Sequence, residues 1–118
     1  MNNTELQDAI VLELSKDIGS VWDSLSVHYE NYSHNGTRME IYVSSFLTSG
    51  LKKDFELSLE SCDLLIELQS NMQDASGNTW SFIDLAAASS GKYNFEYGYG
   101  LPPLAKEQLE RAGELGDM

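Results

Sequence analysis

The chain has 118 residues, hydrophobic residues make up 42% of it, and its formal net charge is -12. This length predicts one domain with a core of its own, and this composition argues against an intrinsically disordered chain. So negative a charge disfavours nucleic acid and anionic membranes as partners and favours a basic protein, although the same acids could serve solubility alone.

The first predicted element is a helix. Thr4 and Gln7 form a capping box at its start, and Gly19 loosens its end. Between them, apolar residues recur at helical spacing: Leu6, Ile10, Leu14, Ile18 and Val21. The N-terminus lacks the pattern of a signal peptide, and no apolar run reaches the roughly 18 residues of a membrane span. We therefore expect a complete cytoplasmic protein.

Two alternating runs around Asn35 and Gly36 predict a β-hairpin. A two-residue turn would place Val43, Ile41 and Met39 opposite His28, Glu30 and Tyr32. A three-residue loop instead pairs Val27 with Val43, Tyr29 with Ile41 and Asn31 with Met39. Because the second register gathers the apolar side chains on one face, we expect burial to select it. The outer face then carries His28, Glu30, Tyr32, Arg38, Glu40 and Tyr42.

Residues 44 to 53 are predicted to be a connection, followed by a helix over residues 55 to 72 with Asp54 as its cap. Cys62, the only cysteine, lies on the apolar face of this helix, and we interpret it as a small core residue. An acidic stripe without any intervening Lys or Arg consists of Glu56, Glu60, Asp63 and Glu67. Like charges at such spacings repel, so the stripe is mildly unfavourable in isolation.

A second hairpin is predicted from residues 79 to 88 and 92 to 100, joined by a loop of Ser89, Ser90 and Gly91. This register pairs Ala87 with Tyr93, Leu85 with Phe95 and Ile83 with Tyr97, which places these aromatic side chains beneath the second helix. The outer face then holds Trp80, Phe82, Asp84, Lys92, Asn94, Glu96 and Gly98. Residues 101 to 118 are expected to form a short helix, begun by Pro102 and Pro103, and a frayed tail.

These elements predict a single α+β domain over residues 1 to 118. Its one antiparallel sheet is built from two β-hairpins in the order α-ββ-α-ββ. The helices pack on one face, and a short C-terminal helix follows.

The expected registers place Glu30 opposite Glu40 and Asp84 opposite Glu96, and directly opposed like charges destabilise a strand pair. We therefore predict that this outer face meets a basic partner. The aromatic anchors among its acids would be Trp80, Phe82, Tyr32 and Tyr42. A solvated face without a partner is the alternative.

Catalysis is not expected. Paired carboxylates could act as acid and base or hold a divalent metal ion. However, His28 and His34 fit no metal-binding spacing, and the sequence lacks a phosphate loop, a nucleophile elbow and a Cys–His pairing. We predict no catalytic residue, no cofactor and no metal ion.

Residues 77 to 100 combine a Trp-initiated strand, a short turn, a Gly-Lys-aromatic step and an aromatic–acidic strand. The residues of this pattern are Gly77, Trp80, Gly91, Lys92, Tyr93, Phe95, Glu96, Tyr97 and Tyr99. The segment resembles the YezG-like family of bacterial immunity proteins, and departs from it at Gly98, where a polar or acidic residue is expected. The resemblance implies a cytoplasmic antitoxin encoded beside a polymorphic or contact-dependent inhibition toxin, whose C-terminal nuclease domain it binds.

The resulting hypothesis is a non-enzymatic immunity protein that binds its cognate toxin through an acidic surface. The candidate toxin-binding residues are Glu30, Glu40, Tyr42, Trp80, Phe82, Asp84 and Glu96 on the sheet, ranked first, and Glu56, Glu60, Asp63 and Glu67 on the helix. An acidic adaptor or secretion chaperone for another basic protein is the alternative. No nucleic-acid or membrane partner is expected, and the oligomeric state is left open.

Overall fold

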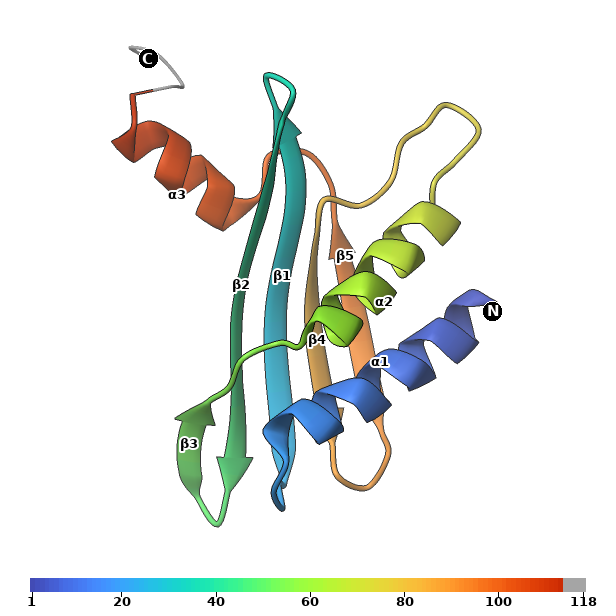
Figure 1. Ribbon diagram of the computed structural model, residues 1–118, viewed down its shortest axis with the longest axis vertical. Helices are drawn as coiled ribbons and strands as arrows, with labels where there is room; N and C mark the ends of the chain where they lie inside the picture. Colours follow the sequence, from blue (N-terminus) through green and yellow to red (C-terminus); the bar gives the residue numbers. More distant parts are fainter. Residues whose placement is uncertain (114–118) are drawn as a thin grey trace.

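The computed structural model describes residues 1–113 of the chain. In this part, five antiparallel strands form one sheet in the order β3-β2-β1-β4-β5, accompanied by three helices (Figure 1). The elements are α1 (Asn3–Ile18), β1 (Ser24–His34), β2 (Thr37–Thr48), β3 (Leu51–Asp54), α2 (Leu59–Asn71), β4 (Phe82–Ala88), β5 (Tyr93–Gly98) and α3 (Pro103–Arg111). The predicted α+β class is confirmed. The predicted tail beyond residue 113 lies outside the described residues.

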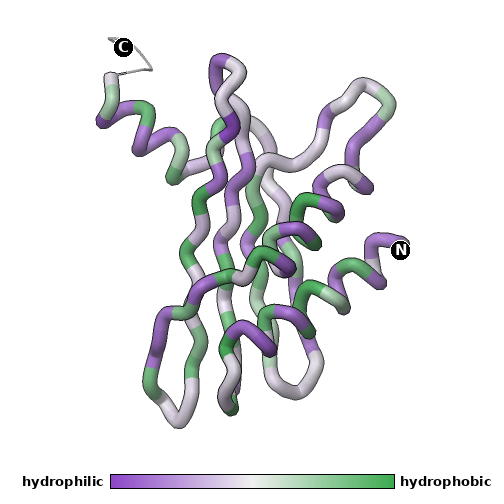
Figure 2. Tube along the Cα trace, viewed as in Figure 1, coloured by the Kyte–Doolittle hydropathy of each residue, from purple (hydrophilic) through white to green (hydrophobic). Residues whose placement is uncertain are grey.

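Helices α1 and α2 lie side by side across one face of the sheet, which we call the helix side. Both helices alternate between hydrophobic and hydrophilic segments (Figure 2), and their apolar stripes enter the core. Fully buried core residues include Leu6, Ile10 and Leu14 of α1 and Leu65 and Leu68 of α2. Burial of one stripe against the sheet is what fixes each helix in place.

Each of these helices has a side-chain cap at its start. Asn2 and Glu5 form the capping box of α1, two residues earlier than the predicted Thr4 and Gln7. Ser58 caps α2, and Asp17 of α1 accepts hydrogen bonds from the Ser58 main-chain N–H (3.1 Å) and the Ser61 hydroxyl (2.6 Å). Asp17 therefore ties the end of one helix to the start of the other, where a carboxylate is favourable.

Helix α3 lies on the opposite, outer face of the sheet, where it packs against β1 and β2. Its buried residues are Ala105 and Leu109, preceded by the buried Pro102. The outer face is therefore partly covered, whereas the sequence led us to expect it open to solvent.

The β1–β2 hairpin has the two-residue turn, so the three-residue loop that we predicted is wrong. Asn35 and Gly36 have φ values of 50° and 78°, as a type I′ turn requires. His34 consequently pairs with Thr37 and Tyr29 with Tyr42.

The two-residue turn and its register are possible because α3 covers part of the outer face. We expected the register that puts every apolar residue on one face, but both faces of this hairpin are partly buried. Met39 and Ile41 lie on the outer face and are half-buried there. Glu40 pairs with Asn31 rather than with Glu30, so the predicted Glu30–Glu40 opposition does not exist.

Residues 44 to 53 are not a connection. Strand β2 continues to Thr48, and a tight turn at Ser49 and Gly50 leads into β3, which pairs with β2 from Leu51 to Asp54. The second helix starts at Leu59 instead of residue 55. Glu56 therefore lies in the segment between β3 and α2 and does not belong to the acidic stripe of the helix.

The β4–β5 hairpin has the predicted register, with Ala87 opposite Tyr93, Leu85 opposite Phe95 and Asp84 opposite Glu96. Gly98 lies opposite Phe82, whose ring crosses it: a Cβ built on Gly98 would be 2.0 Å from Phe82 Cζ. The close approach of this ring explains why a glycine occupies the position.

Trp80 precedes β4 and does not continue its alternation, so our placement of this residue on the outer face is wrong. The chain bends at Ser81, which donates its main-chain N–H to Gly98 O and its hydroxyl to Gly100 O. Trp80 is fully buried and contacts the rings of Tyr29 and Tyr97 on the helix side. It is a core residue.

Candidate functional site

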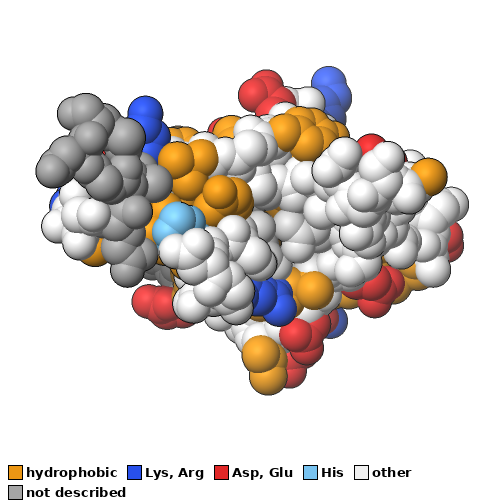
Figure 3. Space-filling view, turned by 90° about the horizontal axis from the view of Figure 1, so that it is seen from above, with side chains coloured by type: hydrophobic (Ala, Val, Ile, Leu, Met, Phe, Trp, Pro, Cys, Tyr) orange, Lys and Arg blue, Asp and Glu red, His pale blue; other side chains and the backbone are white. Residues whose placement is uncertain are grey.

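The structure distributes the eleven predicted binding residues over three environments. Glu30 and Trp80 are buried; Phe82, Asp84 and Glu96 lie on the outer face; Glu40, Tyr42, Glu56, Glu60, Asp63 and Glu67 lie on the helix side or the segment leading to it. Acidic side chains accordingly project from more than one side of the molecule (Figure 3). The single acidic sheet face that we predicted is not formed.

Glu30 is the buried anchor of α3. Its two carboxylate oxygens accept the main-chain N–H groups of Leu104 and Ala105, each at 2.8 Å, and Glu30 Oε2 also lies 2.6 Å from His28 Nε2. Leu104 and Ala105 belong to the first turn of α3, whose N–H groups have no partner within the helix. With 0% exposure, Glu30 has no surface to offer a partner.

His28 joins Glu30 to the outer face. Its Nδ1 lies 2.8 Å from Asp84 Oδ1, and its ring contacts Phe82 at a centroid distance of 5.9 Å. Burial lowers the pKa of His28, but the hydrogen bonds to Glu30 and Asp84 outweigh it, so the pKa is raised above 6.5. When protonated, His28 carries one positive charge between two carboxylates, Glu30 and Asp84. Glu96 has no ion-pair partner among residues 1–113.

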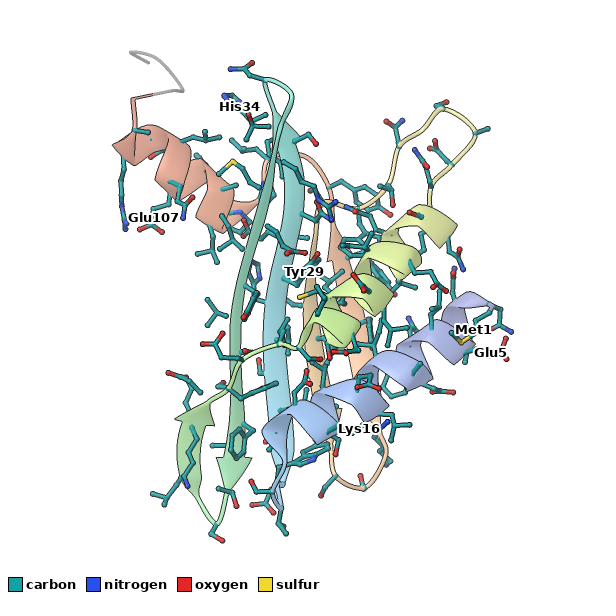
Figure 4. The ribbon with its side chains drawn as sticks, viewed as in Figure 1. Met1, Glu5, Lys16, Tyr29, His34 and Glu107 are labelled. Atoms are coloured by element: carbon teal, nitrogen blue, oxygen red, sulfur yellow. The ribbon has the colours of Figure 1, made fainter. Side chains whose placement is uncertain are left out.

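Two carboxylates on the helix side are held by tyrosine hydroxyl groups. Tyr29 donates to Glu40, and Tyr42 donates to Glu56 Oε2 at 2.6 Å. Burial and the bond to Glu40 raise the pKa of Tyr29, and the bond to Glu56 is the main cause that raises the pKa of Tyr42. Both phenols are neutral donors, so they hold each carboxylate in position without adding a compensating charge. Figure 4 shows Tyr29 next to α2.

The exposed acids of α2 lie beside these two carboxylates. Glu60, Asp63 and Glu67 follow one exposed face of the helix, and none of them has a hydrogen-bond or ion-pair partner among residues 1–113. Cys62, which is buried beside them, has its pKa raised to about 11, first by burial and then by the negative charges of Glu40 and Asp63. We call Glu40, Glu56, Glu60, Asp63 and Glu67 the helix-side acids.

No cation forms an ion pair with a helix-side acid among residues 1–113. Arg38 lies on the same side of β2, and its Nε donates to Asn31 Oδ1 at 2.9 Å rather than to a carboxylate. Three other cations pair within their own helices: Lys16 with Glu13, Lys106 with Glu110, and Arg111 with Glu107. Lys52 and Lys53 lie on β3, and Lys92 precedes β5. The helix-side acids are therefore a negative surface without ion pairs in the described part of the chain.

Sequence reasoning missed the structural role of Glu30 and the tyrosine-held carboxylates. Neither the short helix α3 on the outer face nor the bend at Ser81 leaves a periodic signal in the sequence. Periodicity therefore could not have revealed these roles. Within residues 1–113, no group of three or more His, Cys, Asp and Glu side chains is arranged to hold a metal ion, and no helix is long and apolar enough to cross a membrane.

The geometry defines a small α+β domain with an acidic surface on the helix side of its sheet. Comparison with models of known families and with curated proteins finds no match to this chain. The likeness to YezG-like immunity proteins therefore stays a prediction.

Proposed function

We propose that this chain is an immunity protein that binds and neutralises a cognate bacterial toxin, the nuclease C-terminal domain of a polymorphic or contact-dependent inhibition toxin. The proposal combines the resemblance of residues 77 to 100 with the physical character of the surface. A nuclease presents a basic cleft to its phosphate substrate, and an acidic protein binds such a cleft with electrostatically accelerated association.

The observation that carries the proposal is the set of helix-side acids. Tyrosine hydroxyl groups fix Glu40 and Glu56, and a carboxylate that is already fixed loses less entropy when a partner docks. Glu60, Asp63 and Glu67 repel one another along α2 and gain from a cationic partner. We accordingly rank the helix side above the outer face, which reverses the order that the sequence suggested.

The proposed mechanism is binding without catalysis. Both ring nitrogens of His28 face carboxylates, at 2.6 and 2.8 Å, so neither is open to accept a proton from a substrate. In the cell we place the protein in the cytoplasm, where a newly made or imported nuclease would act.

Two double variants test the proposal, because they reverse the same amount of charge on opposite faces of the sheet. Asp63→Lys with Glu67→Lys acts on the helix side, and Asp84→Lys with Glu96→Lys acts on the outer face. Each variant is co-expressed with the toxin domain encoded beside the gene, and cell survival and Kd are measured.

We expect the helix-side variant to lose protection and to weaken binding by about 30-fold, or roughly 2 kcal/mol, while the outer-face variant binds as the wild type does. Unfolding curves should show that both variants fold. Full protection by both would overturn the acidic-surface proposal. If the toxin domain does not bind but another basic protein does, the alternative of an acidic adaptor or secretion chaperone takes its place.

A further inference from the structure

The main chain of β2 is unpaired along half of one edge. Strand β3 pairs only with the end of β2, from Ser45 to Thr48. The chain then leaves the edge at Phe55, whose N–H donates to Ser44 O at 3.3 Å and whose carbonyl accepts the Ser44 hydroxyl at 2.5 Å. Among residues 1–113, no strand pairs with β2 beyond this point on that side.

The hairpin geometry identifies the unpaired groups. The Asn35–Gly36 turn closes on Thr37, and Leu47 O accepts the Asp23 N–H, so the odd-numbered residues of β2 direct their main-chain groups toward β1. The even-numbered residues direct theirs toward the open edge. Arg38, Glu40 and Tyr42 therefore present N–H and C=O groups without a strand partner.

The surroundings of this edge provide space for an additional strand. A hollow of about 300 Å³ lies where strand pairing stops, lined by residues that include Tyr42, Val43, Ser44 and Glu56. On the outer face, α3 extends past β2 away from the sheet (Figure 1), so it flanks the space beside the edge. Val43, which faces the same side, is 58% exposed.

The charges along the edge select the kind of segment that fits. Side chains of an added strand alternate between the two faces of the sheet. Those on the helix side would meet Glu40 and the Glu56 carboxylate held by Tyr42, and those on the outer face would meet Val43 and the half-buried Ile41. A second copy of this chain is disfavoured, since each copy carries a net charge of -12.

We propose that the open edge of β2 at residues 38 to 42 binds an extended segment of the partner, with basic and apolar side chains alternating, as an added antiparallel strand. The inference rests on the proposed function only for the basic character of the partner. Main-chain hydrogen bonds would supply affinity, and the alternating side chains would supply specificity.

The experiment uses a short synthetic peptide in which lysine and valine alternate, and a glutamate–valine peptide as its counterpart. Amide hydrogen exchange of the wild-type chain is followed by NMR. We expect the N–H groups of Arg38, Glu40 and Tyr42 to exchange quickly in the free chain and to become protected by the lysine peptide alone. Those of Met39 and Ile41 should be protected from the start.

A matched pair of variants separates main chain from side chain. Arg38→Pro removes one outward N–H, whereas Arg38→Ala removes the same side chain and keeps that N–H. We expect the proline variant to weaken peptide binding by at least about tenfold and the alanine variant to bind no worse than wild type. If the proline variant does not fold, the wild-type exchange data decide.

Unchanged exchange at residues 38, 40 and 42, or protection instead at Tyr93, Phe95 and Tyr97 of the β5 edge, would overturn this inference. The survival assay of the helix-side variant tests the proposed function independently of this exchange experiment. A chain that protects cells without protection of these amides would retain the proposed function and lose the added strand.

Discussion

Glu30→Gln is the substitution that most directly tests how the outer face is built. Glu30 accepts two main-chain N–H groups of α3, from Leu104 and Ala105, and faces His28. Glutamine keeps the size of the side chain but has one carbonyl oxygen and one NH₂ group. The NH₂ group is itself a donor and would face a main-chain N–H of α3, so that N–H loses its acceptor.

The size of the effect follows from burial. A hydrogen bond to a charged group contributes about 1.5–3 kcal/mol, and a carboxylate at a helix N-terminus adds about 0.3–2 kcal/mol. With Glu30 at 0% exposure, solvent does not screen these interactions. We expect a loss of about 3 kcal/mol in the free energy of unfolding and a decrease in Tm of roughly 10 °C.

Asp84→Asn is the matched control, because it removes the charge of the second carboxylate that faces His28. The Asp84 side chain is 59% exposed, so this variant should lose less than about 1 kcal/mol. Urea unfolding measures both losses, and amide exchange at Leu104 and Ala105 reports the docking of α3. A Glu30→Gln variant with wild-type stability and equally protected amides would refute the anchoring role of Glu30.

Three further predictions concern groups around the core. Gly98→Ala should destabilise the chain by about 1–3 kcal/mol in thermal unfolding, because its Cβ would lie 2.0 Å from Phe82 Cζ, and Phe82→Leu in the same chain should recover part of the loss. Because the pKa of His28 is raised in the folded chain, the stabilisation that protonated His28 contributes should be fully present below about pH 6.5. It should be lost as pH rises through the pKa in the folded state. His28→Gln should abolish this dependence in unfolding curves measured across that range. Because burial raises the pKa of the Cys62 thiol to about 11, iodoacetamide should modify it slowly at neutral pH and quickly in denaturant; equal rates would contradict its burial.

The sequence was sufficient where one local pattern decided the structure. The β4–β5 register follows from alternation and a three-residue loop with Gly91, and the stripe of Leu6, Ile10 and Leu14 located α1. Both patterns concern elements with one buried face, where hydrophobic periodicity carries the information.

The sequence was insufficient where contacts with a distant element determine the local structure. The register of β1 and β2 depends on the cover that α3 gives to the outer face, and α3 itself depends on Glu30, 74 positions before Leu104 in the chain. The bend at Ser81 that buries Trp80 likewise depends on hydrogen bonds with Gly98 and Gly100. Tertiary contacts of this kind override local strand patterns.

The same distinction explains why we now rank the helix side as the candidate binding surface, whereas the sequence suggested the outer face of the sheet. Acids on a strand look alike in sequence, but the structure separates them by their partners: Glu30 stabilises α3, Asp84 faces His28, and Tyr29 and Tyr42 fix Glu40 and Glu56. A neutral tyrosine donor restrains a carboxylate without offsetting its charge, whereas histidine, when protonated, offsets part of it. Negative charge that is both fixed and uncompensated therefore gathers on the helix side, next to the open edge of β2, which is where a basic partner would gain most.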